Sequence, residues 1–302
     1  MSQGEWARTP RMIELVKKMM ADSWPWTTRQ TFYQFVVLPD HVKDTIGGFP
    51  NNRNSYQKIS GLLTKARESG RIPWEWIVDK SRPTYPGRGG YRCGPAEYLR
   101  RWLLGGNDYH RDYTETQPRL IQVWLEKDAL STTVEKATYP LGVDLVCSRG
   151  YSSASKSKEV ANELQAAADV GKEIVILYLG DHDGSGLDIQ KAMTAKVREY
   201  SRVKFSITRL GILPGDIKKF NLPTQKVKAD DPRTEEFRKK HGDRVVELDA
   251  LPPAELQRRV HDAIVALIDQ KAWQAAIERE KREKRTVEKY LEKFRELLPK
   301  KS

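Results

Sequence analysis

Four short apolar runs in the second half of the sequence alternate with helix-like stretches, and this order narrows the possible folds more than any other feature. The runs are RLIQVWLE from 119, GVDLVC from 142, EIVILYLG from 173 and KFSITRLG from 204. Helical stretches near 128–138, 156–169 and 186–200 lie between them. Strands that alternate with helices form βαβ units, whose strands are parallel. We therefore predict an α/β domain with a doubly wound, mostly parallel sheet.

The first 80 residues show a different, helical pattern. Helices are expected over PRMIELVKKMMAD from 10, over TTRQTFYQFVV with Thr27 or Thr28 as its cap, and over NSYQKISGLLTKARES closed by Gly70. The following RIPWEWIVD from 71 has the aromatic and β-branched character of a strand or wing. Three helices and a wing are the order of a winged helix-turn-helix domain, whose third helix enters a DNA groove.

Basic residues on the third predicted helix are the candidate DNA contacts. They are Lys58, Lys65, Arg67 and, just beyond the helix, Arg71. The chain as a whole carries a formal charge of +12, which favours an anionic partner because neutralised phosphates release condensed counterions. An ordinary solvated helix face on a basic protein would show the same residues, so both interpretations stay open.

The chain of 302 residues is long enough for two domains, each with its own core. We predict a winged-helix DNA-binding domain over 1–80 and a metal-binding domain over 118–270. A connector rich in turn-forming residues, with one helix at PAEYLRRWLL, spans 81–117. A charged helix follows over 271–302, and its partial apolar stripe either packs on the parent domain or mediates self-association.

Several classes of protein are excluded by what the sequence lacks. No run approaches the roughly 20 apolar residues of a membrane span, and the N-terminus has no secretory signal. Cys93 and Cys147 suggest neither a disulfide framework nor a zinc cluster, and the five histidines show no metal-ligand spacing. No Ser-His-Asp or Cys-His site and no ATP-binding loop is visible. We expect a soluble cytoplasmic protein.

Acidic residues follow two of the predicted strands at the edge where ligands of parallel sheets gather. Glu126 ends the first run, and Asp181 and Asp183 follow the third in GDHDGSG. In an extended segment the two aspartates point the same way, so three carboxylates can share one pocket. Hard oxygen ligands of this kind suit Mg²⁺ or Mn²⁺, and Gly184 and Gly186 let backbone and phosphate approach closely. The alternative is a plain strand-to-helix turn with capping side chains.

Glu126, Asp181, Asp183 and Gly186 in this order resemble the Toprim domain of topoisomerases, bacterial primases and some nucleases, over about 119–210. The resemblance implies that the glutamate assists proton transfer or metal binding and that the aspartates hold Mg²⁺. Lys127 is a candidate phosphate contact beside the glutamate. The loop 148–155 with Arg149 either holds phosphate or is a plain polar loop. A primase is not expected, because two cysteines cannot make its usual zinc module.

Arg29 and Tyr33 lie four residues apart in the second predicted helix and so share one face. Their stretch RQTFY resembles the Arg-x-x-Phe/Tyr-Tyr motif of the DNA-cleaving subunit of topoisomerase VI and its meiotic double-strand-break relatives, which join a winged helix to a Toprim domain in this order. The resemblance implies that Tyr33 attacks a phosphodiester and that Arg29 positions it. Such a tyrosine is also common in helix cores, and then a metal-activated water would hydrolyse DNA.

The run Glu247-Leu248-Asp249-Ala250-Leu251 also resembles a segment of that family. We expect Asp249 to cap the next helix and allow Glu247 a supporting role beside the metal. This chain resembles a short or divergent member. The resemblance implies a homodimer on double-stranded DNA, with Tyr33 of one protomer facing the metal of the other, and an ATPase partner for any duplex transport. A third possibility is a catalytically inert DNA-binding protein.

Overall fold

The computed structural model of this chain describes residues 3–21, 23–78, 109–147, 154–226, 237–239 and 241–297. It contains two compact units. The first combines Met1–Ser81 with Arg119–Leu267, and the second combines Arg82–Pro118 with Ile268–Ser302. The predicted helix at PAEYLRRWLL and the predicted phosphate contact Arg149 lie outside the described residues.

The three helices predicted at the N-terminus are present, with one short helix added between them. Their bounds are Gln3–Met20 for α1, Thr28–Val36 for α2, Asp40–Asp44 for α3 and Arg53–Glu68 for α4. Thr27 caps α2 because its side chain accepts a hydrogen bond from the Gln30 amide while the Gln30 side chain accepts one from the Thr27 amide. Phe35 and Ile59 are fully buried where α2 packs on α4.

The strand predicted from 71 is wrong over its first part, where a 3-10 turn, η1 at Trp74–Trp76, stands instead. Pro73 lacks an amide hydrogen and therefore cannot take part in a regular strand ladder. Only a single parallel bridge follows, between Trp26 and Ile77. Any continuation of a wing from 79 lies outside the described residues.

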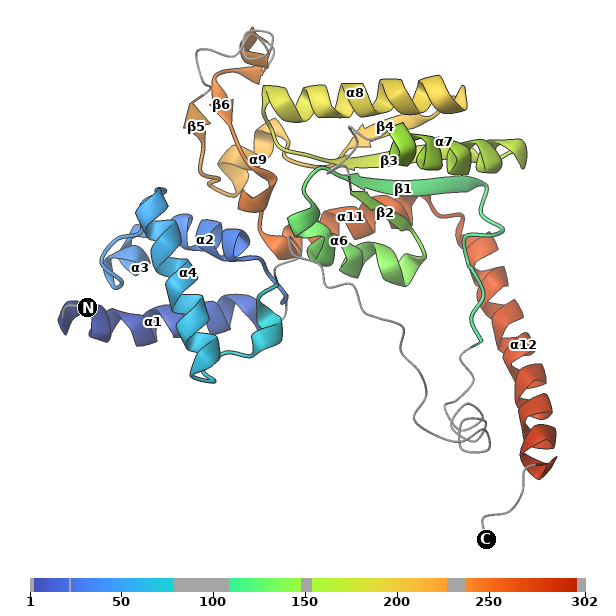
Figure 1. Cartoon of the computed structure of the whole chain (residues 1–302), viewed down its shortest axis with the longest axis horizontal. Coiled ribbons are helices and arrows are strands. Elements are labelled where there is room, and N and C mark those ends of the chain that lie inside the picture. The colour runs from blue at the N-terminus through green and yellow to red at the C-terminus, as the bar shows by residue number, and fades with distance from the viewer. Residues whose placement is uncertain are drawn as a thin grey trace. The chain divides into compact units, whose positions relative to one another are not determined.

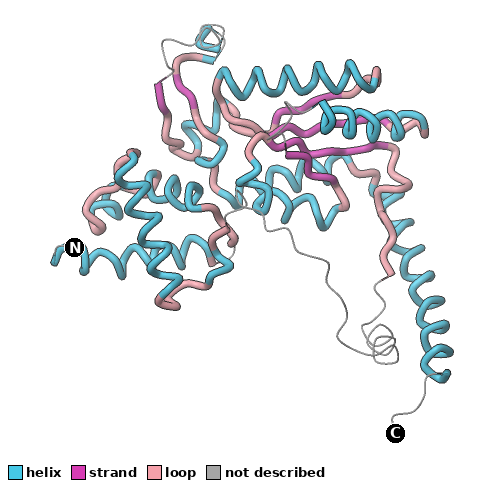
Figure 2. The backbone as a smooth tube through the Cα atoms, in the orientation of Figure 1, coloured by secondary structure: helices cyan, strands magenta, loops and turns pink. Residues whose placement is uncertain are grey.

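All four predicted strands are present and form one parallel sheet (Figures 1 and 2). They are β1 at Arg119–Leu125, β2 at Asp144–Cys147, β3 at Glu173–Leu179 and β4 at Ser206–Arg209, in the order β2-β1-β3-β4. In the register of β1 and β3, Leu125 lies opposite Leu179, so these strands end side by side. The prediction of a parallel α/β sheet is confirmed.

Helices cover both faces of this sheet, as a doubly wound fold requires (Figure 1). One face carries α7 at Ala154–Asp169 and α8 at Gly184–Ser201, which contact each other. The other carries α6 at Ser131–Thr138 and α11 at Pro253–Leu267, which form a second pair. Trp124 of β1 is fully buried in the core under α7 and α8.

A small antiparallel pair of strands was not predicted from the sequence. It joins β5 at Gln225–Lys226 to β6 at Arg244–Val245. Directly after β6, His182 and Val246 exchange backbone hydrogen bonds of 2.9 and 3.2 Å. A 3-10 turn, η4 at Leu248–Ala250, follows. This bridge places the segment 246–250 beside the loop after β3.

The second unit is built on the predicted C-terminal helix, α12 at Gln270–Leu297. The segment 109–118 lies along it: the Tyr109 hydroxyl donates to Glu283 at 2.7 Å, and Arg111 donates to the same carboxylate at 3.1 Å. Leu291 is buried, whereas Tyr290 and Phe294 are exposed. Among the described residues, we find no helix with the length and apolar character needed to span a bilayer.

Candidate functional site

The side chain of Glu126, at the end of β1, meets the backbone of the loop that follows β3. The backbone amide of Glu126 donates to Leu179 at 2.9 Å, which extends the β1–β3 ladder to the end of β1. The side chain of Glu126 then turns back, and its Oε2 accepts a hydrogen bond of 3.0 Å from the amide of Asp181. The structure thus brings Glu126 to the loop that carries both predicted aspartates.

Asp183 stands at the start of α8, where its extended backbone gives it the N-cap position. Its Oδ1 accepts a hydrogen bond of 2.6 Å from the amide of Gly186. The capping role that the sequence left open is therefore present. The charge of Asp183 also acts on Glu126, whose pKa it helps to raise.

Gly180 and Gly186 leave the space that the Glu126 side chain occupies. A Cβ atom on Gly180 would lie 2.6 Å from Glu126 Oε2, and one on Gly186 would lie 2.6 Å from the carbonyl oxygen of Asp181 and 3.0 Å from the same Oε2. These glycines therefore serve the approach of the Glu126 side chain to the backbone of the Asp181 loop. For Gly186 the sequence had suggested close approach of backbone and phosphate.

Gly186→Ala is expected to destabilise the fold by about 1–3 kcal/mol, the usual cost of overpacking, because backbone atoms of the Asp181 loop must shift. The free energy of unfolding in urea measures the effect. Gly61→Ala in α4 is the matched control: no atom lies within 4 Å of its new Cβ, so it should stabilise the protein by about 0.5–1 kcal/mol. Equal effects of the two changes would contradict the packing argument.

Lys127 reaches into a group of acidic side chains rather than toward solvent. Its Nζ lies 3.0 Å from Asp181 Oδ2, 3.0 Å from Glu247 Oε2 and 2.8 Å from Asp249 Oδ2. Burial opposes its charge, but the neighbouring carboxylates, Asp249 first, raise the pKa of Lys127 above its ordinary value. We call the five acidic residues gathered here the carboxylate cluster: Glu126, Asp181, Asp183, Glu247 and Asp249.

The segment after β6 supplies two members of the carboxylate cluster, Glu247 and Asp249. From the sequence, Glu247 was expected only in a supporting role and Asp249 as a helix cap. Asp249 was expected to cap α11, but that helix begins at Pro253 and the Asp249 side chain is only 2% exposed against Lys127. The amide of Leu248 donates to Asp181 Oδ1 at 2.7 Å. Asp249 is wrongly predicted because the His182–Val246 bridge, which sets its position, has no local sequence signal.

Tyr33 and Arg29 of α2 lie beside the same segment in the same chain. Arg29 Nε is 3.3 Å from Glu247 Oε2. Tyr33 is only 3% exposed and packs on Phe32, with ring centroids 5.1 Å apart. Burial, followed by the charge of Glu247, raises the pKa of Tyr33 above its ordinary value. Its phenol is therefore firmly protonated near neutral pH.

The basic residues predicted to contact DNA fall into separate groups. Lys58, Lys65 and Arg71 line a hollow of about 380 Å³ between α1 and α4. Arg67 lies elsewhere, with its guanidinium 4.9 Å from the ring centroid of Trp74, an exposed side chain. Three of the four predicted residues therefore share one surface.

Electrostatic repulsion is concentrated at Glu126. Burial, and next the charge of Asp181, raise the pKa of Glu126 from 4.5 to about 7. Burial also raises the pKa of Asp181 above its ordinary value, although Lys127 opposes this. Carboxylates that share a buried site repel one another until a cation neutralises them.

The stability of the metal-free protein should reflect this raised pKa. Because folded Glu126 holds its proton more tightly than the unfolded chain does, its contribution to stability is complete below about pH 4.5 and is lost as pH rises to about 7. We expect the Tm of Glu126→Gln in EDTA to exceed that of wild type by an increasing margin from pH 5 to pH 8, roughly. A pH-independent margin would contradict the raised pKa.

The cluster fits a divalent cation in its donor chemistry. Its members offer hard carboxylate oxygens, the ligands that Mg²⁺ and Mn²⁺ prefer. The pKa of Glu126 is raised first by burial and then by the charges of Asp181 and Asp183, which such an ion would offset. In the described part of the chain, no three or more His, Cys, Asp or Glu side chains are already arranged closely enough to hold a metal ion. Binding would therefore require the side chains to adjust.

Arg209 at the end of β4 is a further residue that the sequence did not single out. It donates to the carbonyl oxygens of Gly180 at 3.2 Å and of Asp181, and to Gln190 at 2.9 Å. It thereby holds the backbone of the Asp181 loop in place. Its only sequence signal is its place at the end of a parallel strand.

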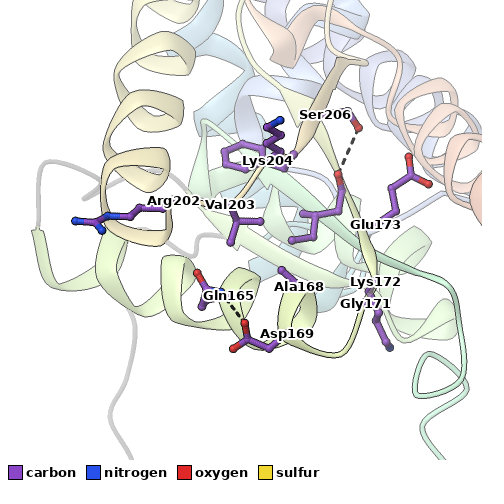
Figure 3. Close-up of a pocket in the computed structure, with 12 residues that line it drawn as sticks. Gln165, Ala168, Asp169, Gly171, Lys172, Glu173, Arg202, Val203, Lys204 and Ser206 are labelled. Atoms are coloured by element: carbon purple, nitrogen blue, oxygen red, sulfur yellow. Dashed lines mark hydrogen bonds between the residues drawn. The ribbon is translucent and has the colours of Figure 1, made fainter.

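A second hollow in the described part of the chain lies away from the cluster. It measures about 670 Å³ and lies at the amino ends of β3 and β4, between the ends of α7 and α8 (Figure 3). Gln165 donates to Asp169 at its rim. Since the carboxylate cluster lies at the opposite ends of these strands, this hollow contributes nothing to it.

Comparison with known proteins gives no relative: no family model, curated protein or solved structure matches this chain.

Proposed function

We propose that this chain cleaves double-stranded DNA with the help of Mg²⁺ or Mn²⁺, in the manner of the DNA-cleaving subunit of topoisomerase VI. The observation that carries the proposal is the meeting of Glu126 and Asp181 at the ends of β1 and β3. Buried carboxylates in mutual repulsion are what a divalent-ion site for phosphodiester chemistry requires.

Each residue of the site has a proposed role. Glu126, Asp181 and Asp183 would hold the ion, which when bound stabilises the charge that develops on the leaving oxygen. By resemblance Glu126 would also assist proton transfer. Arg29 positions the phosphate, and the Tyr33 oxygen attacks phosphorus as the bond to the deoxyribose oxygen breaks. The proton that the phenol loses ends on that departing oxygen. The resulting phosphotyrosine conserves bond energy, so the break can be resealed.

DNA would be held by the N-terminal segment, which we propose to act as a winged-helix domain. Lys58, Lys65 and Arg71 offer one basic surface for phosphates, and Arg67 with the exposed Trp74 offers another. By resemblance the enzyme would be a homodimer, whereas in this structure Arg29 and Tyr33 lie beside Glu247 of their own chain. Transport of one duplex through another would need a separate ATPase partner.

A second candidate function is hydrolysis by a metal-activated water, as in a nuclease that acts against plasmids or phage. The burial and raised pKa of Tyr33 favour it, because a covered, protonated phenol is a weak nucleophile. Tyr33 would then be a core residue of α2.

Incubation of supercoiled plasmid with the purified protein and Mn²⁺, followed by denaturant with or without protease, separates these functions. Tyrosyl attack predicts ends that stay linked to protein until protease is added, and no cleavage by Tyr33→Phe. Hydrolysis predicts free ends and persistent cleavage by Tyr33→Phe. Tyr56→Phe is a matched control, since Tyr56 packs on the same Phe32 ring but is partly exposed.

A further inference from the structure

Lys127 is held in the carboxylate cluster by two hydrogen bonds, to Glu247 and Asp249, and by an ion pair with Asp181. An ammonium has three N–H donors and no acceptor. The acceptors within reach are one oxygen each of Asp181, Glu247 and Asp249, at 2.8 to 3.0 Å. In this arrangement the ammonium faces three carboxylates of its own chain, and not a DNA phosphate as the sequence suggested.

The three carboxylates around Lys127 come from two separate segments of the chain. Asp181 follows β3, whereas Glu247 and Asp249 flank the start of η4. The side chains of Asp181 and Asp249 are 11% and 2% exposed, so water contributes little to neutralising them. A positive charge among them is needed if they are to stay ionised.

Asp181 belongs to two groups at once. On one side its amide donates to Glu126, which lies toward Asp183 at the start of α8. On the other side its Oδ2 faces the Lys127 ammonium together with Glu247 and Asp249. The carboxylate of Asp181 therefore faces Lys127 and the Leu248 amide, whereas only its backbone amide faces Glu126. Among Asp181, Glu247 and Asp249 the chain itself supplies the cation.

We infer that Lys127 fills a second cation subsite, formed by Asp181, Glu247 and Asp249, which would otherwise take a second divalent ion. The ammonium thus limits the centre to the single ion held by Glu126, Asp181 and Asp183. Glu247 pairs both with Lys127 and, at 3.3 Å, with Arg29 of α2. The ammonium of Lys127 therefore also helps to position α2 beside the cluster. The inference rests on the divalent-ion site of the proposed function.

The number of bound Mn²⁺ ions per chain, measured by equilibrium dialysis on the full-length protein without DNA, tests this inference. Lys127→Met keeps the length of the side chain and removes its charge, so it should bind one ion more than wild type. Lys127→Arg keeps the charge and should bind as many ions as wild type. The extra ion should disappear in Lys127→Met/Asp249→Asn. An unchanged number in folded Lys127→Met would overturn the inference.

Asp249→Asn alone keeps the test decisive if Lys127→Met does not fold. With Lys127 in place, Asp249 holds an ammonium and not a metal, so the variant should bind the same number of Mn²⁺ ions as wild type. Loss of an ion would show that Asp249 is a metal ligand and would overturn the inference.

Failure of the proposed function gives a different result. If wild type binds no Mn²⁺, the divalent-ion site at Glu126, Asp181 and Asp183 is absent. The comparison of Lys127→Met with wild type still tests the role of Lys127. Lys127→Met gains an ion over wild type only if the ammonium of Lys127 had been occupying a cation subsite.

Discussion

Asp181→Asn is expected to reduce plasmid cleavage by roughly 10³-fold, the effect of removing several kcal/mol of transition-state stabilisation. Asp181 binds Glu126 through its backbone amide and Lys127 through its carboxylate, and its replacement removes a charge while keeping the shape of the side chain. The amide oxygen of asparagine can still accept the hydrogen bond from Leu248. The rate of loss of supercoiled plasmid in Mn²⁺ measures the effect.

Asp144→Asn is the matched control for this experiment. Asp144 is exposed at the amino end of β2, so its charge acts far from the carboxyl ends of the strands. Its variant should cleave like wild type. Full cleavage by Asp181→Asn would instead remove the carboxylate cluster from the mechanism, and absence of cleavage by wild type would favour a DNA-binding protein without activity of its own.

Arg259→Met is expected to lower the free energy of unfolding by about 3–5 kcal/mol, because it leaves a buried carboxylate without its cation. Arg259 of α11 donates to both oxygens of Asp216 at 2.8 and 2.9 Å and to the carbonyl oxygen of Gly211 at 2.9 Å. The side chains of Arg259 and Asp216 are only 12% and 8% exposed. Equilibrium unfolding in urea measures the loss.

Arg258→Met provides the comparison within the same helix. Arg258 pairs with Glu255 and Asp262, but its side chain is 57% exposed, and ion pairs of this kind contribute at most about 1 kcal/mol. The two variants remove the same charge from adjacent positions. If Arg258→Met and Arg259→Met lowered the free energy of unfolding equally, removal of any positive charge from this helix would have the same effect. Burial of the Arg259–Asp216 pair would then not be what stabilises this region.

The parallel sheet could be predicted because its signals are local. Each strand is a short apolar run, and each run is followed by a helix with its own period. The strand predicted from 71 failed over Trp74–Trp76, where aromatic residues suggested a strand but Pro73 precedes a 3-10 turn. The β5–β6 pair was missed since each strand has only two residues.

Only those residues of the candidate site that come directly after a strand could be predicted from the sequence. Glu126 and Asp181 lie directly after β1 and β3, so the register of the sheet brings them together. The positions of Lys127 and Asp249 depend instead on a bridge between His182 and Val246, residues far apart in the sequence. Arg209 supports the loop through backbone oxygens, which carry no sequence signature.

The carboxylate cluster is assembled from segments that leave the ribosome at different times. Glu126 and Lys127 are made first, Asp181 and Asp183 some fifty residues later, and Glu247 and Asp249 last. Until the final segment has been synthesised and bridged to the loop after β3, Lys127 lacks two of its three partners and α2 lacks the contact of Arg29 with Glu247. A nascent chain thus carries an incomplete centre.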